Sequence, residues 1–315
     1  MEMNRKEFLQ TLGVAGTALT TGTFGALDVF AQTEIKDGPV DLVAVMGGEP
    51  AAMLKKAIEE LGGMERFIKK GQKIVVKPNI AWDQPPEVAA NTNPELVAEL
   101  VKMVLAAGAA EVVVFDSTCD RWTDSYKKSG IAKAVEDAGG KMASGDPQAD
   151  GNFEMVKLPK AKKLKEVQMH KSILACDAWI NVPVLKHHPG TQMTIAMKNC
   201  MGLINKKSQQ SCHSIDLQQC IADLCTWEKK PVLNIIDAYR VLKQNGPKGR
   251  SEADAVLVKA LVASPDIVAA DTASAKLAQQ FTNIAVEAVG HLRHGQEHGL
   301  GTMDIDKLNV RRVRV

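Results

Sequence analysis

The chain has 315 residues, a formal net charge of +2 and a charged fraction of 24%. This length supports one or two domains. So small a net charge excludes the strong positive field that draws nucleic acid or an anionic membrane to a protein. Beyond the N-terminal stretch, no apolar run approaches the ~20 residues needed to cross a bilayer. We therefore expect neither nucleic acid as a partner nor a transmembrane span.

Residues 1–31 have the pattern of a cleavable signal peptide. Arg5 and Lys6 form a short charged start, a weakly apolar stretch follows, and Ala31 ends a plausible cleavage site. The start resembles a twin-arginine export signal, with Lys6 in place of the second arginine. The alternative is a native amphipathic helix, which the four glycines of the stretch disfavour. The sequence thus predicts an exported, periplasmic protein that meets the export machinery through this segment.

From residue 32 onwards, strand and helix signals alternate. A helix is expected to begin at Asn93-Pro94, with Asn93 as its N-cap, and to end at Gly108. The other helices are expected at 51–61, 131–138, 215–227 and 267–277. The expected strands are 40–46, 73–76, 111–115, 178–185, 193–197, 232–236 and 256–263. This order predicts one α/β domain over 32–315, with a mostly parallel open sheet and helices on both faces. Residues 145–171, where the pattern loosens, are a possible insertion or small lobe.

Polar, chargeable residues follow most of the expected strands. Open α/β sheets bind ligands beyond the carboxyl ends of their strands, so these side chains are expected to meet there. Any one of them alone could be a solvated loop residue, whereas the set together favours function. The candidate ligand-binding residues are Lys77, Asn79, Asp116, Lys186, Thr194, Asn199, Asp266 and Asp271. The candidate catalytic residues are His187, Lys198 and Asp237.

The residue types indicate a small anionic ligand. Lys77, Lys186 and Lys198 are cations suited to carboxylate or phosphate oxygens, and His187 titrates near neutral pH. Asp237 and Asp271 are expected near these lysines, because a carboxylate beside an apolar wall needs a cation or hydrogen-bond donors. The alternative is that Asp237 begins a turn and Asp271 caps a helix.

None of the six cysteines lies in a C-x-x-C pair, so the sequence signals no iron–sulfur cluster and no metal site. The cofactor is therefore unknown. Most of the cysteines are expected to be buried, although Cys212, Cys220 and Cys225 could pair in an oxidising compartment. Cys220 and Cys225 point about 140° apart on a helix. We therefore expect them to share no metal.

Several stretches resemble the family of domain of unknown function 362. They are VVKPN (75–79), TNPELV (92–97), VPVLKHH (182–188), TIAMKNCMG (194–202), LNIIDA (233–238), NGP (245–247) and ASPDIVAAD (263–271). The resemblance implies a family and no reaction. Some relatives carry ferredoxin-like cysteine motifs, which this chain lacks. A more distant likeness to the lactate racemase family motivates acid/base chemistry on a carboxylate-bearing substrate.

Two hypotheses about function follow from these observations. The first is an enzyme acting on a small anion, in which the lysines hold the substrate and His187 or Asp237 moves a proton. The second is an exported accessory protein that holds a redox cofactor or a metal without turnover. The twin-arginine-like segment motivates the second hypothesis, because that route carries folded, often cofactor-loaded proteins.

Overall fold

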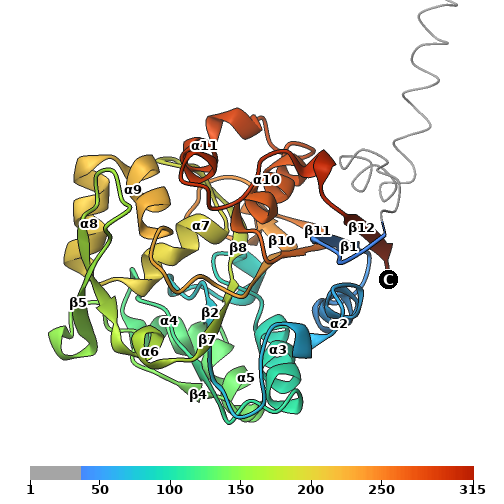
Figure 1. The fold of residues 1–315 in the computed structure, drawn as a ribbon, viewed down its shortest axis with the longest axis horizontal. Coiled ribbons are helices and arrows are strands. Elements are labelled where there is room, and N and C mark those ends of the chain that lie inside the picture. Colours follow the sequence, from blue (N-terminus) through green and yellow to red (C-terminus); the bar gives the residue numbers. More distant parts are fainter. Residues whose placement is uncertain (1–36) are drawn as a thin grey trace, which may run out of the picture.

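The computed structural model describes residues 37–315, and the expected signal peptide lies outside them. A ten-stranded mixed sheet forms the centre of the protein, with its main path in the order β12-β1-β11-β10-β7-β2-β3-β4 (Figure 1). The strands of this sheet are β1 (Leu42–Met46), β2 (Lys73–Pro78), β3 (Glu111–Val114), β4 (Lys141–Met142), β7 (Ala178–Val182), β8 (Val184–His188), β9 (Gln192–Thr194), β10 (Leu233–Leu242), β11 (Ala255–Ser264) and β12 (Val310–Arg314).

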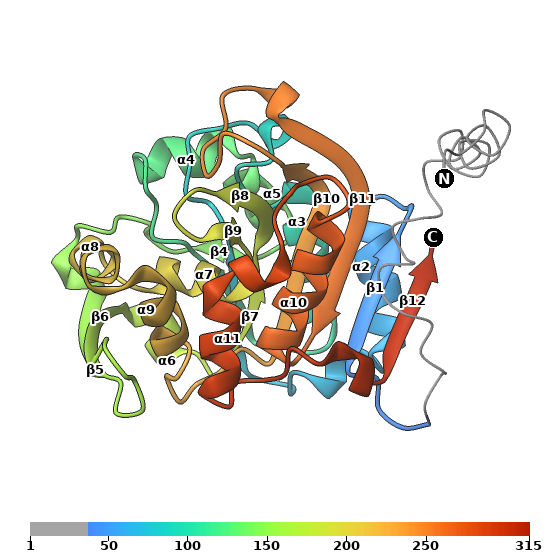
Figure 2. The ribbon, with the colours of Figure 1, turned by 90° about the horizontal axis from the view of Figure 1, so that it is seen from above.

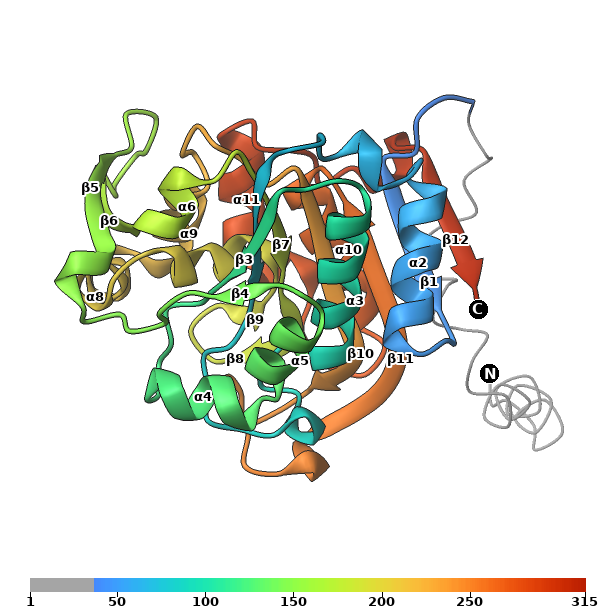
Figure 3. The same cartoon turned by 90° about the horizontal axis from the view of Figure 1, so that it is seen from below.

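Helices cover both faces of the sheet, as the alternating sequence pattern predicted. On one face, which is in front in Figure 3, lie α2 (Pro50–Glu60), α3 (Pro94–Ala106), α4 (Trp122–Lys128) and α5 (Ile131–Asp137). On the other face lie α6 (Lys171–Ala175), α7 (Ala196–Asn199), α8 (Lys206–Ile215), α9 (Leu217–Leu224), α10 (Ile267–Ala278) and α11 (Gly290–Glu297). Alternate residues of each strand therefore enter different cores: Val43 of β1 packs in one and Ala44 in the other.

Most neighbouring strands of the main path run parallel, and β11 runs against both of its neighbours, β10 and β1. The loop after β11 therefore leaves the sheet at the edge opposite to the carboxyl ends of β2, β3 and β7. Asp266 follows β11 and lies at that opposite edge. The expectation that Asp266 joins the other strand-end residues was wrong, because the sequence pattern does not reveal the direction of a strand.

Two expected strands are interrupted. The run 178–185 breaks at Pro183 into β7 and β8, since proline has no N–H for the ladder. β10 pairs first with β7 and then with β8, so it continues past Asp237 to Leu242. The run 193–197 ends as a strand at Thr194, and α7 begins at Ala196. Asp271 of α10 causes that change, because its carboxylate accepts hydrogen bonds from the N–H groups of Ala196 (2.7 Å) and Met197 (2.9 Å).

Helix α3 begins as its sequence predicted. The side chain of Asn93 accepts hydrogen bonds from the N–H groups of Glu95 and Leu96, and Pro94 occupies the first turn. The helix ends at Ala106, just before Gly108.

The stretch 145–171 forms a hairpin outside the main sheet. Its strands β5 (Phe153–Lys157) and β6 (Glu166–His170) make a separate antiparallel pair, at the opposite side of the molecule from β12 (Figure 2). The buried carboxylate of Asp223 in α9 holds the hairpin by accepting hydrogen bonds from three consecutive backbone N–H groups, those of Lys162, Lys163 and Leu164. Within residues 37–315, no helix has the length and apolar character to span a membrane.

Candidate functional site

A cavity of ≈ 220 Å³ lies beyond the carboxyl ends of β2 and β3. The chain leaves β2 towards β3 and leaves β7 towards β8 and β10, so the two neighbouring strands continue in opposite directions along the sheet. Such switch points are where open α/β sheets bind ligands. The lining residues are Asn79, Ala81, Trp82, Asp116, Ser117, Cys119, Lys186, His188, Thr194, Lys198, Asn199, Met201, Gly202, Gln209, His213 and Pro247.

A fully buried ion pair forms the floor beneath the cavity. The Nζ of Lys77 lies 2.6 Å from Oδ1 of Asp116, and the two side chains are 0% and 2% exposed. Lys77 also donates to the carbonyl of Pro78 (2.9 Å) and to Oδ1 of Asn199 (3.0 Å), which occupies all three of its protons. Burial raises the pKa of Asp116, while the ammonium of Lys77 opposes that rise. Lys77 is therefore a structural cation that faces protein groups.

Gly202 is required at this floor. A Cβ at residue 202 would overlap Oδ1 of Asp116 and would lie 2.5 Å from Nζ of Lys77. The carbonyl of Gly202 also accepts a hydrogen bond from the N–H of Ser117 (3.0 Å), and this bond holds the loop after β3 in place. The glycine that ends the TIAMKNCMG stretch thus allows the ion pair to form.

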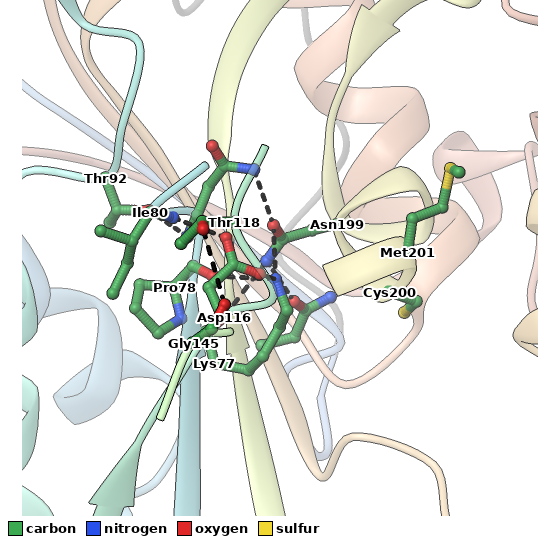
Figure 4. A network of polar contacts seen from close by, with 12 residues as sticks. Lys77, Pro78, Ile80, Thr92, Asp116, Thr118, Gly145, Asn199, Cys200 and Met201 are labelled. Atoms are coloured by element: carbon green, nitrogen blue, oxygen red, sulfur yellow. Dashed lines mark hydrogen bonds and ion pairs between the residues drawn. The ribbon is translucent and has the colours of Figure 1, made fainter. Parts of the chain in front are cut away.

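Asparagine amides connect the floor to the neighbouring strands (Figure 4). Oδ1 of Asn199 accepts from Lys77 and, at 3.1 Å, from Nδ2 of Asn79. Nδ2 of Asn199 donates to the carbonyl of Lys77 (3.2 Å) and to Oδ1 of Asn181 in β7 (2.9 Å). Asn181 in turn donates to Oδ1 of Asn234 in β10 (3.2 Å). This chain of amides fixes the orientation of Asn79 and Asn199.

Lys186 enters the cavity from β8, and its hydrogen-bond partners among the described residues are neutral groups. Its Nζ donates to Oδ1 of Asn79 (2.9 Å) and to the carbonyl of Ala90, and the residue is 1% exposed. The pKa of Lys186 is lowered to about 7, chiefly by burial; the nearby Cys119 and Asp116 oppose this shift, and the charges of Lys198 and Lys77 contribute to it. Within residues 37–315, no carboxylate forms an ion pair with Lys186. The amine is therefore held in place without an ion-pair partner in the part of the chain that the structure describes.

Lys198 has an even poorer partner. It lies in α7, is 9% exposed, and donates to the thioether sulfur of Met201 at 3.4 Å. Burial lowers its pKa to about 8. In the described part of the chain, its ammonium has no carboxylate partner. Asp271 caps the N-terminus of α7 from the far side and so sets the position of Lys198.

Further polar groups line the same cavity. Ser117 is 3% exposed, and its hydroxyl has no hydrogen-bond partner among residues 37–315. Nδ1 of His188 accepts from the N–H of Gly190 (3.1 Å), which places the proton of the neutral ring on Nε2. Burial lowers the pKa of His188 to about 2, so the ring stays neutral. The thiol of Cys119 and the ring of His213 also line the cavity.

Two of the three expected catalytic residues lie outside the cavity. Residues 186 and 188 of β8 face one side of the strand and His187 faces the other, because side chains alternate along a strand. Nδ1 of His187 accepts from the N–H of Gly246 (3.2 Å), so His187 supports the loop between β10 and β11. Asp237 lines a separate cavity of ≈ 250 Å³, together with Asn93 and Arg240.

Three aspartates serve as backbone acceptors. Asp237 accepts from the N–H groups of Asn93 (2.7 Å) and Tyr239 (3.0 Å), and burial raises its pKa to about 6. Asp271 caps α7, and burial raises its pKa to about 7. Asp266 caps α10. The expectation that Asp237 and Asp271 lie beside the lysines was wrong, because backbone N–H groups take the place of cations.

The structure thus brings six of the expected residues to the cavity wall: Asn79, Asp116, Lys186, Thr194, Lys198 and Asn199. Lys77 lies directly beneath them. Sequence reasoning missed His188, Ser117 and Gly202 as site residues. The alternation of side chains in β8 could have identified His188, since it follows Lys186 by two positions.

The cysteines are all free, and five of the six are buried. The neighbouring thiol of Cys212 lowers the pKa of Cys220, while the neighbouring thiol of Cys200 raises the pKa of Cys225. Cys220 and Cys225 therefore face different neighbours, in agreement with their helical spacing. In the described part of the chain, no group of three or more His, Cys, Asp or Glu side chains could hold a metal ion.

The fold and the site define an α/β protein with a lysine-lined cavity at the switch point of its sheet. The model of the domain of unknown function DUF362 matches residues 74–276, and the chain belongs to this family. A thylakoid-associated protein of Synechocystis sp. is 27% identical over 237 residues, which cover 71% of this chain and 68% of the relative.

Among solved structures, the lactate racemase apoprotein from Thermoanaerobacterium thermosaccharolyticum is similar, with a TM-score of 0.47 and 13% identity. The similarity covers 74% of this chain and 56% of the racemase chain, so this chain spans little more than half of that protein.

Proposed function

We propose that the cavity binds a small ligand bearing a carboxylate or phosphate group, with Lys198 as its principal anchor. The observation that carries the proposal is the buried ammonium of Lys198, whose one hydrogen-bond acceptor among the described residues is the sulfur of Met201. Taking an ammonium out of water costs several kcal/mol unless an anion compensates it. A ligand anion is the partner that would compensate this cation.

The neighbouring groups favour the same class of ligand. The hydroxyl of Ser117 has no partner in the described protein, and Nε2–H of His188 is a neutral donor. Lys186 adds a second nitrogen whose protein partners are uncharged. Donors without an opposing carboxylate suit oxyanions, which accept several hydrogen bonds at once. A volume of ≈ 220 Å³ equals about seven water molecules at ~30 Å³ each, so the ligand is small.

A thermal-shift screen with small carboxylates and inorganic phosphate tests this proposal. The Lys198→Met variant removes the charge and keeps most of the apolar stem. Lys133→Met is the matched control, because Lys133 is an exposed lysine on α5 that pairs with Asp137. At least one anion should raise the melting temperature of the wild type and of the control by the same amount. The proposal fails if Lys198→Met responds equally or if no anion stabilises the wild type.

Natively purified protein distinguishes this proposal from a cofactor-holding role. Elemental analysis and an absorption spectrum would detect a retained metal or a coloured group. A colourless, metal-free protein that gains stability from small anions supports the anion site. A stoichiometric metal or chromophore that occupies the cavity and prevents anion binding would contradict it.

We also propose that residues 1–31 direct export. The support is the charged Arg5-Lys6 start, the weakly apolar stretch and the small residues around Ala31. Cell fractionation of the full chain, compared with an Arg5→Gln/Lys6→Gln variant, tests this. The wild type should reach the periplasm in a shortened form, and the variant should stay in the cytoplasm at full length. Equal distribution of the two proteins would refute the proposal.

A further inference from the structure

The three buried lysines of the site differ in what they contact. Lys77 has three acceptors, one of them the carboxylate of Asp116, so every proton of its ammonium is used. Lys198 has a sulfur as its acceptor. Lys186 lies between these cases, with two neutral oxygen acceptors and no ion pair among residues 37–315. The site therefore contains one structural cation, one cation without a counter-ion, and one amine held by neutral groups.

The contacts of Lys186 leave one direction of its nitrogen without a hydrogen-bond partner among residues 37–315. A neutral amine has two N–H bonds, one bond to Cε and one lone pair, arranged as a tetrahedron. The two N–H bonds are directed at Oδ1 of Asn79 and at the carbonyl oxygen of Ala90. The lone pair then occupies the remaining direction. Lys186 is one of the residues that line the cavity, so a ligand bound there lies beside this amine.

We propose that Lys186 is a nucleophile that forms a Schiff base with a small 2-oxo acid whose carboxylate is held by Lys198. This inference rests on the anion site proposed above. It assigns the ligand a second feature beside its negative charge, namely a carbonyl group next to the carboxylate. Lys198 is assigned as the anchor because it lacks an oxygen acceptor among the described residues, and Lys186 is assigned as the nucleophile because two neutral oxygens hold its amine.

The chemistry needs no oxidant or reductant. The lone pair on Nζ of Lys186 attacks the carbonyl carbon, the π electrons move to the carbonyl oxygen, and a carbinolamine forms after proton transfer from nitrogen to oxygen. The C–O bond then breaks, the hydroxyl leaves as water with a second proton, and the C=N bond remains. One amine and one oxo acid thus give one imine and one water molecule. The amides and carbonyls around Lys186 orient the amine for the attack.

The protonation of Lys186 supports this role. A lysine with an ordinary pKa of about 10.4 is almost entirely charged at neutral pH and cannot attack. Burial lowers the pKa of Lys186 to about 7, so roughly half of the molecules carry the free amine at that pH. Desolvation is a recognised way of activating a Schiff-base lysine.

Reductive trapping tests the proposal. The full-length protein is incubated with pyruvate or glyoxylate and cyanoborohydride, and the product is digested for peptide mass mapping. We expect one saturable adduct on Lys186, whose added mass is that of the oxo acid less one oxygen atom. Lys186→Arg keeps the charge but cannot form the stable imine, and should carry about tenfold less adduct. Acetone, which lacks a carboxylate, should give no saturable adduct.

If the arginine variant fails to fold, the residue that carries the adduct in the wild-type protein still tests the proposal. Adduct spread over exposed lysines such as Lys133, or equal in Lys186→Arg, would overturn the proposal. If carboxylates still stabilise the protein through Lys198 while no adduct forms on Lys186, the Schiff-base inference alone fails. If carboxylates do not stabilise the protein either, the proposed anion site fails with it.

Discussion

Gly202→Ala is the perturbation that tests the floor of the cavity most sharply. The new methyl group would overlap Oδ1 of Asp116 and lie 2.5 Å from Nζ and 2.8 Å from Cε of Lys77. Both charged groups are buried, and they approach to 2.6 Å. The atoms that the methyl group would meet belong to two buried, paired side chains, which have no solvent to move into. The methyl group must therefore either separate the ion pair or displace the backbone at residue 202.

Each outcome has a predictable magnitude. Breaking a buried ion pair costs about 3–5 kcal/mol. Overpacking a core with a shifted backbone costs about 1–3 kcal/mol. We therefore expect Gly202→Ala to lower the free energy of unfolding by about 3 kcal/mol, which is a change of more than a hundredfold in the folding equilibrium at 1.4 kcal/mol per tenfold.

Gly151→Ala is the matched control, because a Cβ at residue 151 would meet no atom within 4 Å. Its expected effect is within about 1 kcal/mol, of either sign. Urea unfolding followed by circular dichroism measures both variants against the wild type. The reasoning is refuted if the two alanine variants unfold at the same urea concentration. The ion pair would then not constrain residue 202.

Four further predictions concern the cavity and its surroundings. Anion affinity should fall about tenfold per pH unit above about 8, because Lys198 loses its ammonium there; a flat profile from titration calorimetry would contradict this. His188→Asn should weaken anion binding, whereas His187→Asn should lower the free energy of unfolding and leave anion binding unchanged. The reverse result would show that His187, and not His188, faces the ligand. Asp237→Asn should keep the ligand-induced thermal shift. In this variant the free energy of unfolding should also depend less on pH between pH 4 and 6. In the wild type the folded-state pKa of Asp237, about 6, exceeds its unfolded-state pKa, so this carboxyl stabilises the protein most at low pH and the contribution is lost as the pH rises. A maleimide should label Cys119 before the five buried cysteines, and bound anion should slow that reaction; labelling indifferent to anion would place the ligand elsewhere.

Local signals explain why much of the fold was predictable. The N-cap Asn93 and Pro94 define the start of α3 through contacts within four residues, and apolar runs mark the strands. The errors arose where a distant group decides the structure. α7 replaces the end of an expected strand because Asp271 caps it from 75 positions away along the chain. The direction of β11, which removes Asp266 from the site, is likewise a property of the whole sheet.

In the site, too, the features set by local sequence could be predicted and those set by distant groups could not. The sequence placed Lys186, Lys198 and Asn199 at or after the ends of expected strands, and the general rule for open α/β sheets predicted that they meet. They do line one cavity, although Lys198 and Asn199 lie in α7 and not at the end of a parallel strand. The role of each lysine could not be inferred, because it depends on partners distant in sequence. Asp116 pairs with Lys77 from the next strand, whereas Lys198 is left with a sulfur atom. The three lysines thus have three different sets of partners.

The crystal structure of the protein with the anion that stabilises it best tests the central claim most directly. We expect a carboxylate or phosphate oxygen within hydrogen-bond distance of Nζ of Lys198, with Ser117 or Nε2 of His188 as a second donor. Lys77 should remain paired with Asp116 beneath the ligand. An anion bound only at surface lysines, with the cavity filled by water and Lys198 still directed at Met201, would contradict the account.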